Sequence, residues 1–129
     1  MSVAAAHATQ FFDDVAASGR VWTLRDAGGF PSPPGDGGRA MPFWSSLSRV
    51  ELIISRVDAY KEFEPVELAL SVFLERWIPG LERDGLKVGV NWSGARAMGY
   101  DFAPGEVTEA IRARLTATSN NRLEPQRHE

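Results

Sequence analysis

Two short phrases constrain the fold more than any other feature of the chain, because each has the pattern of a strand that ends at a tryptophan. They are Pro42-Phe43-Trp44-Ser45-Ser46 and Val88-Gly89-Val90-Asn91-Trp92-Ser93-Gly94. β-branched and aromatic residues are typical of strands, and the small residues after each tryptophan favour turns and helix caps. A buried tryptophan also needs a partner for its indole N–H. The phrases therefore predict two core strands whose ends can line one shared pocket or groove.

The composition is that of a soluble globular protein. The chain has 129 residues, of which 43% are hydrophobic and 24% are charged, so it can bury a core without a disulfide or a structural metal. It has no cysteine, which excludes thiol nucleophiles, thiolate zinc sites and iron–sulfur ligation. The net charge is −3 without a basic cluster, which argues against nucleic-acid binding. With neither a secretory signal nor a run of ~20 apolar residues, we expect a cytoplasmic protein that does not engage membranes.

Hydrophobic periodicity separates the expected helices from the expected strands. Apolar residues that recur at i, i+3 and i+4 indicate amphipathic helices, whereas β-branched and aromatic runs or alternation indicate strands. The predicted helices cover residues 4–18, 48–57, 65–84 with an interruption at Pro79-Gly80, and 104–115. The predicted strands cover residues 21–24, 40–44, 59–63, 86–92 and 100–102. Because strands and helices mix without regular β-α alternation, we expect an α+β fold, a small mixed or antiparallel sheet packed with about four helices.

Several residues define the expected boundaries and irregularities. Pro42 implies an edge position or a bulge, and Gly89 implies a bulge or close approach of another group to the backbone. Ser48 fits a capping box at the start of its helix, with Ser46 as the competing cap. The Gly/Pro-rich segment 25–39 predicts a mobile hairpin end, with a functional loop as the alternative.

No linker divides the chain into domains. We expect one α+β domain over residues 1–118. The polar segment 119–129 is expected to be a disordered C-terminal tail, since it has few apolar residues to offset the entropy of ordering.

Common catalytic arrangements find little support in the sequence. Both histidines, His7 and His128, lie close to the termini, away from a rigid scaffold that could hold a general base or a metal ligand. The segment Gly89–Gly94 has the outer spacing of a phosphate-binding loop, but Ala95-Arg96 follows it in place of Lys and a hydroxyl residue. We therefore predict no metal site, no cofactor and no catalytic residue.

The two tryptophan phrases supply the candidate binding surface. Core packing is the simpler interpretation of each tryptophan, and an aromatic-lined cleft with polar anchors is the alternative. Arg49 falls in the first turn of its helix, where the helix dipole disfavours a cation. Its partner is then an internal carboxylate by default, or an anionic ligand or protein group. The candidate surface consists of Trp44, Ser45, Arg49, Asn91, Trp92 and Ser93.

Four phrases in order resemble a small bacterial family, domain of unknown function 2750. They are Val21-Trp22-Thr23-Leu24, Pro42-Phe43-Trp44-Ser45-Ser46 with Arg49, Trp77-Ile78-Pro79-Gly80-Leu81, and Val88-Gly89-Val90-Asn91-Trp92-Ser93-Gly94. The similarity covers roughly residues 8 to 115. It implies a compact bacterial α+β domain and carries no catalytic residues. A looser similarity of pattern, to the N-terminal domain of SseB-like enhancer proteins and to toxin-immunity domains, implies an interaction module.

Two classes of function remain open at this point. The first is a non-enzymatic binding or protein-interaction module, immunity- or regulator-like, whose partner is an unknown protein or small ligand. The alternative is a small enzyme of unrecognised type that uses Arg49, Asn91 and an acid such as Asp26 around an aromatic-lined cleft. A subunit of a homo-oligomer is a third possibility.

Deletion of residues 119–129 tests the expected tail. The melting temperature of the shortened protein should stay within about one degree of the full chain, because the polar segment buries little apolar surface. A drop of several degrees, measured by circular dichroism, would show that this segment docks on the domain or in an oligomer interface.

Overall fold

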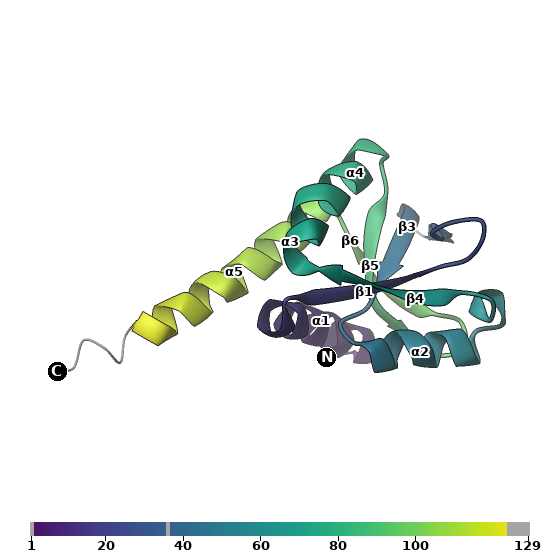
Figure 1. The fold of residues 1–129 in the computed structure, drawn as a ribbon, viewed down its shortest axis with the longest axis horizontal. Coiled ribbons are helices and arrows are strands. Elements are labelled where there is room, and N and C mark those ends of the chain that lie inside the picture. The colour runs from purple at the N-terminus through teal and green to yellow at the C-terminus, as the bar shows by residue number, and fades with distance from the viewer. Residues whose placement is uncertain (1, 36, 124–129) are drawn as a thin grey trace.

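The structure is a computed structural model that describes residues 2–35 and 37–123 (Figure 1). Helices and strands follow one another without regular alternation, which confirms the α+β fold. The elements are α1 (Val3–Ser18), β1 (Arg20–Arg25), β2 (Pro34–Gly35), β3 (Gly38–Phe43), α2 (Leu47–Arg56), the 3-10 helix η1 (Asp58–Tyr60), β4 (Glu64–Ala69), α3 (Leu70–Val72), the π-helix η2 (Phe73–Trp77), α4 (Ile78–Arg83), β5 (Lys87–Ser93), β6 (Met98–Phe102) and α5 (Pro104–Leu123).

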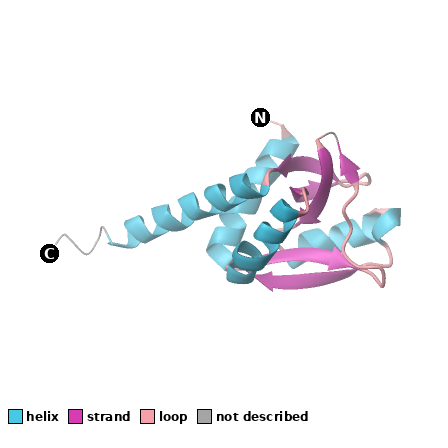
Figure 2. Ribbon diagram, turned by 90° about the horizontal axis from the view of Figure 1, so that it is seen from above, coloured by secondary structure: helices cyan, strands magenta, loops and turns pink. Residues whose placement is uncertain are grey.

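The strands form two groups that meet at one point. A four-stranded mixed sheet has the order β2-β3-β5-β6, in which β3 and β5 are parallel, and β1 and β4 form a separate antiparallel pair. The groups meet where Trp22 and Trp44 exchange backbone hydrogen bonds of 2.8 and 2.7 Å. Figure 2 shows the helices gathered around both groups. The bridge places the end of β3 at the centre of the molecule.

Two apolar clusters hold the layers together. One cluster joins the four-stranded sheet to α1, α4 and α5 through residues such as Phe11, Phe43 and Ile111. The other joins the ends of β3 and β5 to α2 and η1 through Trp44, Trp92, Val50, Ile53 and Tyr60. The apolar residues at helical spacing within 48–57 therefore face this cluster: Val50, Ile53 and Val57 are buried and Ile54 is partly buried. The cluster also contains both tryptophans of the candidate surface.

Two predictions around Pro65 are wrong. The strand expected at 59–63 is replaced by η1 and a turn, and the helix expected from Pro65 begins only after strand β4. Pro65 lies in β4 opposite Leu24, on a strand that pairs with β1 alone. An edge strand tolerates the missing proline N–H, and the half-buried Val66 and Leu68 alternate with exposed residues. Pairing with β1 thus overrides the helix-start signal.

The helical segment after β4 differs from its prediction at Pro79-Gly80. There is no interruption there: α3, η2 and α4 follow one another directly from Leu70 to Arg83. The π turn places the hydrogen bond of the Ile78 N–H on the carbonyl of Phe73 and widens the helix just before Pro79. Proline has no backbone N–H, so it is tolerated at a point where the helical hydrogen-bond pattern already changes. The helix ends close to the predicted limit of residue 84: Gly85 has a φ of 70°, and Leu86 N donates to Leu81 O at 2.9 Å.

Ser46, and not Ser48, is the cap of α2. Its hydroxyl accepts the backbone N–H of Arg49 at 3.3 Å, and the helix begins at Leu47. The capping-box prediction at Ser48 is therefore wrong, because Ser48 already lies within the first turn. The competing cap weighed for this helix is the correct one.

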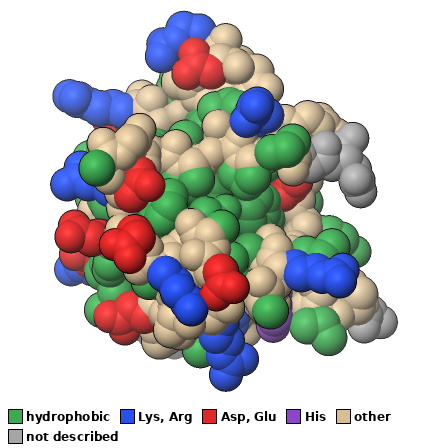
Figure 3. All heavy atoms as spheres, turned by 90° about the vertical axis from the view of Figure 1, so that its right-hand side faces the viewer, with side chains coloured by type: hydrophobic (Ala, Val, Ile, Leu, Met, Phe, Trp, Pro, Cys, Tyr) green, Lys and Arg blue, Asp and Glu red, His purple; other side chains and the backbone are tan. Residues whose placement is uncertain are grey.

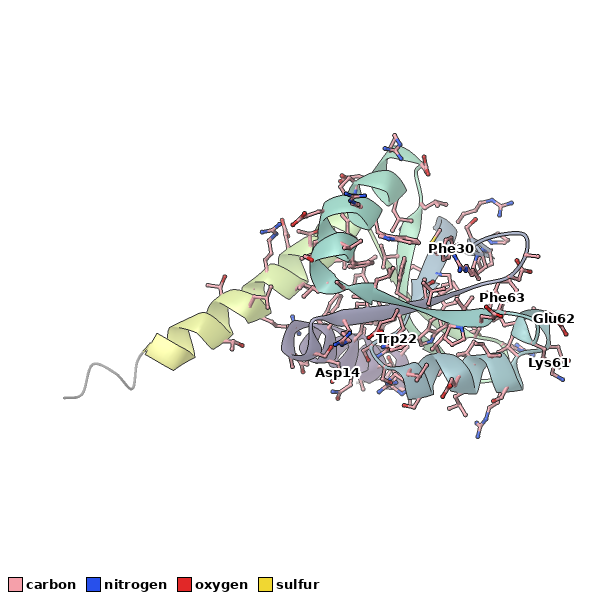
Figure 4. All side chains as sticks on the ribbon, viewed as in Figure 1. Asp14, Trp22, Phe30, Lys61, Glu62 and Phe63 are labelled. Carbon is pink, nitrogen blue, oxygen red and sulfur yellow. The ribbon has the colours of Figure 1, made fainter. Side chains whose placement is uncertain are left out.

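The Gly/Pro-rich segment is attached to the domain at several points. Asp26 and Gly29 close a turn through two backbone bonds, and β2 pairs with β3. The Phe30 ring, labelled in Figure 4, meets Trp77 edge-on with 4.9 Å between ring centroids. The Arg39 guanidinium donates to the carbonyl of Ser32 at 2.8 Å. These contacts anchor the segment between β3 and the helices.

Helix α5 extends well beyond the rest of the molecule (Figure 1). Val107 and Ile111 are buried, and Arg114 bonds to Asp13 of α1 at 2.7 Å. The helix continues to Leu123, so its last turn enters the segment 119–129 that was expected to be a tail, and residues 124–129 lie outside the described residues. Among the described helices, none combines the length and apolar character that crossing a membrane requires.

Replacement of Ile53 by Ala tests the packing of α2. Ile53 is 3% exposed, so the free energy of unfolding should fall by about 2–5 kcal/mol. The matched control is Leu52→Ala on the same helix, where the side chain is 49% exposed and the loss should stay below about 1 kcal/mol. Urea unfolding of both variants gives the comparison, and equal losses would contradict the assigned helix face.

Candidate functional site

The ends of β3 and β5 are joined through their tryptophans. Trp44 is fully buried, and its indole N–H donates to the backbone carbonyl of Trp92 at 2.9 Å. The indole N–H of Trp92 donates to Asp101 Oδ1 on β6 at 3.0 Å. Each tryptophan therefore has the polar partner that burial demands, and the two predicted strand ends do lie side by side.

Asn91 connects these strand ends to α1. Its Oδ1 accepts the backbone N–H of Ser45 at 2.9 Å, and its Nδ2 donates to Ser45 Oγ and to the carbonyl of His7, both at 3.1 Å. Ser45 Oγ donates in turn to Asp14 at 2.9 Å. We call these four residues the Ser45–Asn91 network. Asn91 is 1% exposed and has a φ of 47°, a conformation that asparagine tolerates better than most residues.

The Trp92 ring lies directly against the backbone of two neighbouring strands. A Cβ added at Gly99 would come within 2.8 Å of Trp92 Cδ1, and one added at Gly89 would overlap the same ring. This close approach confirms the prediction for Gly89, and the register of β5 and β6 also shifts between Val90 and Ser93. Two glycines therefore determine where the Trp92 ring lies.

A small pocket, which we call the basic pocket, opens between α1, α2 and the end of β5. Its volume is about 160 Å³, and it is lined by His7, Arg49, Leu52, Ile53, Arg56, Trp92, Ser93 and Gly94. No carboxylate belongs to the lining. Neither Arg49 nor Arg56 makes an ion pair or a guanidinium hydrogen bond with any residue that the structure describes. The pocket thus combines two uncompensated cations with apolar walls.

A larger pocket, the Tyr60 pocket, lies on the other side of Trp92. Its volume is about 390 Å³, and it is lined by Pro33, Pro34, Val57, Ala59, Tyr60, Trp92, Arg96, Ala97, Met98, Gly99 and Asp101. It is found at the end of the molecule that carries η1 and the Lys61-Glu62-Phe63 turn (Figure 4). Figure 3 looks onto this end and shows apolar side chains gathered in its middle with charged side chains around them.

Tyr60 is the polar side chain that stands out in this larger pocket. It is 7% exposed, and burial raises the pKa of its hydroxyl, so the group keeps its proton near neutral pH. The hydroxyl makes no hydrogen bond with the described part of the chain, and since none of the described buried side-chain oxygens lacks a partner, this hydroxyl is open to solvent. A neutral hydroxyl that lines a pocket and lacks a protein partner can bind a polar atom of a ligand.

The six residues of the candidate surface divide into two groups. Trp44, Ser45 and Asn91 lie beneath the surface and form the structural connections described above. Arg49, Trp92 and Ser93 line the basic pocket. The structure therefore brings all six together around the adjoining ends of β3 and β5 and the start of α2, and three of them line a pocket.

Other residues of the site were not predicted from the sequence. Arg56 lies seven residues after Arg49, a spacing that places both on one face of a helix, so the signal was present. His7 was set aside for its position near the terminus, yet its ring Nδ1 lies 3.3 Å from Ser93 Oγ. Asp26, the acid considered for an enzyme, accepts the N–H of Gly28 at 2.8 Å and lines neither pocket. Within residues 2–35 and 37–123, no cluster of three acidic or histidine side chains could hold a metal.

Comparison with known proteins identifies a family and a distant structural likeness. The model of the family "Protein of unknown function (DUF2750)" matches residues 8–111. A solved structure, Anabaena Tic22 (protein transport), is 14% identical, with a TM-score of 0.43 over 64% of this chain and 45% of that one. The present chain therefore spans less than half the length of that protein. A search of curated proteins finds no match.

Substitution of Asn91 tests whether the network holds the strand ends. Asn91→Ala leaves the Ser45 N–H and the His7 carbonyl without their partner and places a Cβ residue at positive φ, so unfolding should become about 2–4 kcal/mol easier. The control is Ser93→Ala, which removes only the contact with His7 and should cost less than about 1 kcal/mol. Chemical unfolding measures both, and a small loss for Asn91→Ala would refute the structural role.

Proposed function

The chain belongs to the DUF2750 family, proteins of unknown function, and on that premise we propose that it is a non-enzymatic protein-interaction module. In this proposal the basic pocket holds an acidic group of the partner. The family match covers every lining residue of the pocket except His7. An immunity- or regulator-like role, a bacterial origin and a cytoplasmic location stay predictions from the sequence.

The observation that carries the proposal is the pair Arg49 and Arg56. Neither guanidinium has a carboxylate partner among the described residues, and Arg49 also stands in the first turn of α2, where the helix dipole disfavours a cation. The default expectation for Arg49 was an internal carboxylate, and the lining of the pocket provides none. An anionic group from outside the domain would relieve both costs, because arginine pairs with carboxylates in a bidentate geometry.

The size of the pocket favours one group of a protein over a whole small molecule. Pockets for drug-sized ligands occupy roughly 300–1,000 Å³, whereas the basic pocket has about 160 Å³. That space accepts one side chain or a terminal carboxylate. Leu47 and Leu52 are exposed on the same helix and provide apolar area of the kind that surrounds anchor residues in interfaces.

The enzyme alternative has weaker support. It requires Arg49, Asn91 and an acid to converge on a reacting atom. Asn91 is instead occupied by three hydrogen bonds within the domain, and Asp26 lies in a separate turn. The other alternative is that Arg49 only stabilises the fold. Measuring the stability of the Arg49→Ala variant together with its binding distinguishes this role from a role in binding.

Selection from a random peptide display library tests the proposal. The wild-type protein should enrich peptides with an aspartate, a glutamate or a free C-terminal carboxylate beside apolar residues. The affinity of enriched peptides for Arg49→Ala should fall at least about tenfold, since a charge-assisted pair of this kind contributes roughly 1.5–3 kcal/mol.

Arg112→Ala is the matched control, because Arg112 is exposed on α5 and lines neither pocket. Its affinity should equal that of the wild type. Enrichment of peptides without acidic groups would contradict the proposal. It would also be contradicted if Arg49→Ala lost stability while its binding per folded molecule stayed unchanged.

A further inference from the structure

We propose that the basic pocket and the Tyr60 pocket together bind one extended segment of the partner, with an acidic residue in the first and a tyrosine in the second. This inference rests on the proposed function and specifies the sequence that the module recognises. In this proposal the Tyr60 pocket binds a tyrosine side chain, and the hydroxyl of that side chain forms a hydrogen bond with the hydroxyl of Tyr60. Three features support this assignment: both pockets are lined by Trp92, the Tyr60 hydroxyl has no partner among the described residues, and arginines line both pockets.

Trp92 joins the two pockets. It is a lining residue of both, and its ring is held in place by Gly89, Gly99 and the bond to Asp101. The pockets also share the connection from β5 to β6: Ser93 and Gly94 line the first, and the Arg96-Ala97-Met98 stretch lines the second. The two pockets are therefore neighbours along the Trp92–Met98 stretch. An extended chain rises roughly 3.3 Å per residue, so the acidic residue and the tyrosine should be two to four positions apart.

The Tyr60 pocket has the walls that an aromatic side chain requires. Pro33, Pro34 and Trp92 contribute apolar surface, and Arg96 can lie over an aromatic face as a cation. Tyr60 is more than nine-tenths buried, but its hydroxyl, which has no partner among the described residues, is open to solvent, so it can exchange water for a polar atom of a ligand. Phenylalanine would fill the space without satisfying that hydroxyl, and tyrosine does both.

The backbone at this pocket adds an independent observation. Ala97 has a φ of 51°, in a region that a residue with a Cβ rarely adopts. Asn91, which has a similar φ, forms side-chain hydrogen bonds, whereas an alanine side chain cannot. Backbone conformations of this kind concentrate at ligand clamps. Ala97 is also the residue between Arg96 and Met98, which both line the pocket.

Charge favours an acidic segment. Arg49, Arg56 and Arg96 are distributed over the two linings, in which Asp101 is the carboxylate. The whole chain has a net charge of −3, so this surface is positive against the overall balance. Such a local field attracts an acidic segment and disfavours a basic one.

Synthetic peptides test the proposal on the full chain. Each has a neutral Gly/Ser background with one glutamate, followed after one, two, three or four intervening residues by tyrosine, phenylalanine or alanine. Isothermal titration should show the tightest binding for tyrosine at one of the first three spacings. Tyrosine should exceed phenylalanine by about threefold to tenfold, the effect of one hydrogen bond.

Two variants assign the effect to the pocket. Tyr60→Phe retains the ring and should abolish the preference for tyrosine over phenylalanine. Ala59→Phe introduces bulk from an exposed position of η1 and should bring the tyrosine peptide down to the affinity of the alanine peptide. Melting temperatures of both variants confirm that they remain folded.

The outcomes separate the two proposals. If glutamate peptides bind in an Arg49-dependent manner but the aromatic residue adds nothing, the protein-interaction proposal stands and the bipartite one is overturned. If tyrosine helps equally in the wild type and in Ala59→Phe, the aromatic residue binds elsewhere and the bipartite proposal is again overturned. If no glutamate peptide loses affinity in Arg49→Ala, the proposed function itself fails.

Discussion

The side chain of Asn91 is the element on which the surroundings of both pockets depend. Through one amide it contacts the chain just after β3 and the carbonyl of His7 in α1, while its own backbone belongs to β5. These three segments are far apart in the sequence, and no backbone pairing joins α1 to the strand ends. A buried amide that satisfies all its partners gives a rigid connection, because every alternative position leaves a polar group without a hydrogen bond.

The position of Trp92 follows from that connection. Asn91 and Trp92 lie within the irregularity of the β5–β6 pairing between Val90 and Ser93, and the absence of side chains at Gly89 and Gly99 leaves space for the indole ring. The carbonyl of Trp92 then accepts the indole N–H of Trp44. Trp92 is in this way fixed as a lining residue of both pockets.

Much of this arrangement could be predicted from local sequence patterns. The strand that ends at Trp92 and the helix α2 each have a hydrophobic period of their own, and the strand that ends at Trp44 is an apolar and aromatic run. The start of β4 could not be predicted in this way, because Pro65 is a good helix-start signal and only its pairing with β1 reveals a strand. The burial of Asn91 was equally hidden, since its partners lie in α1 and after β3. Contacts between distant segments arise from tertiary structure, and the residue pattern of a single sequence does not reveal them.

The long projection of α5 gives the two ends of the domain very different surroundings. Helix α1 starts at Val3, about one helical turn before His7, so any group joined ahead of it is placed beside the basic pocket. Helix α5 instead runs out from the body on the side away from η1 and the Lys61–Phe63 turn (Figure 1). A dye, a surface anchor or a second protein domain joined beyond that helix is therefore held clear of both pockets. The molecule can be immobilised through its C-terminal end while both pockets stay open to solution.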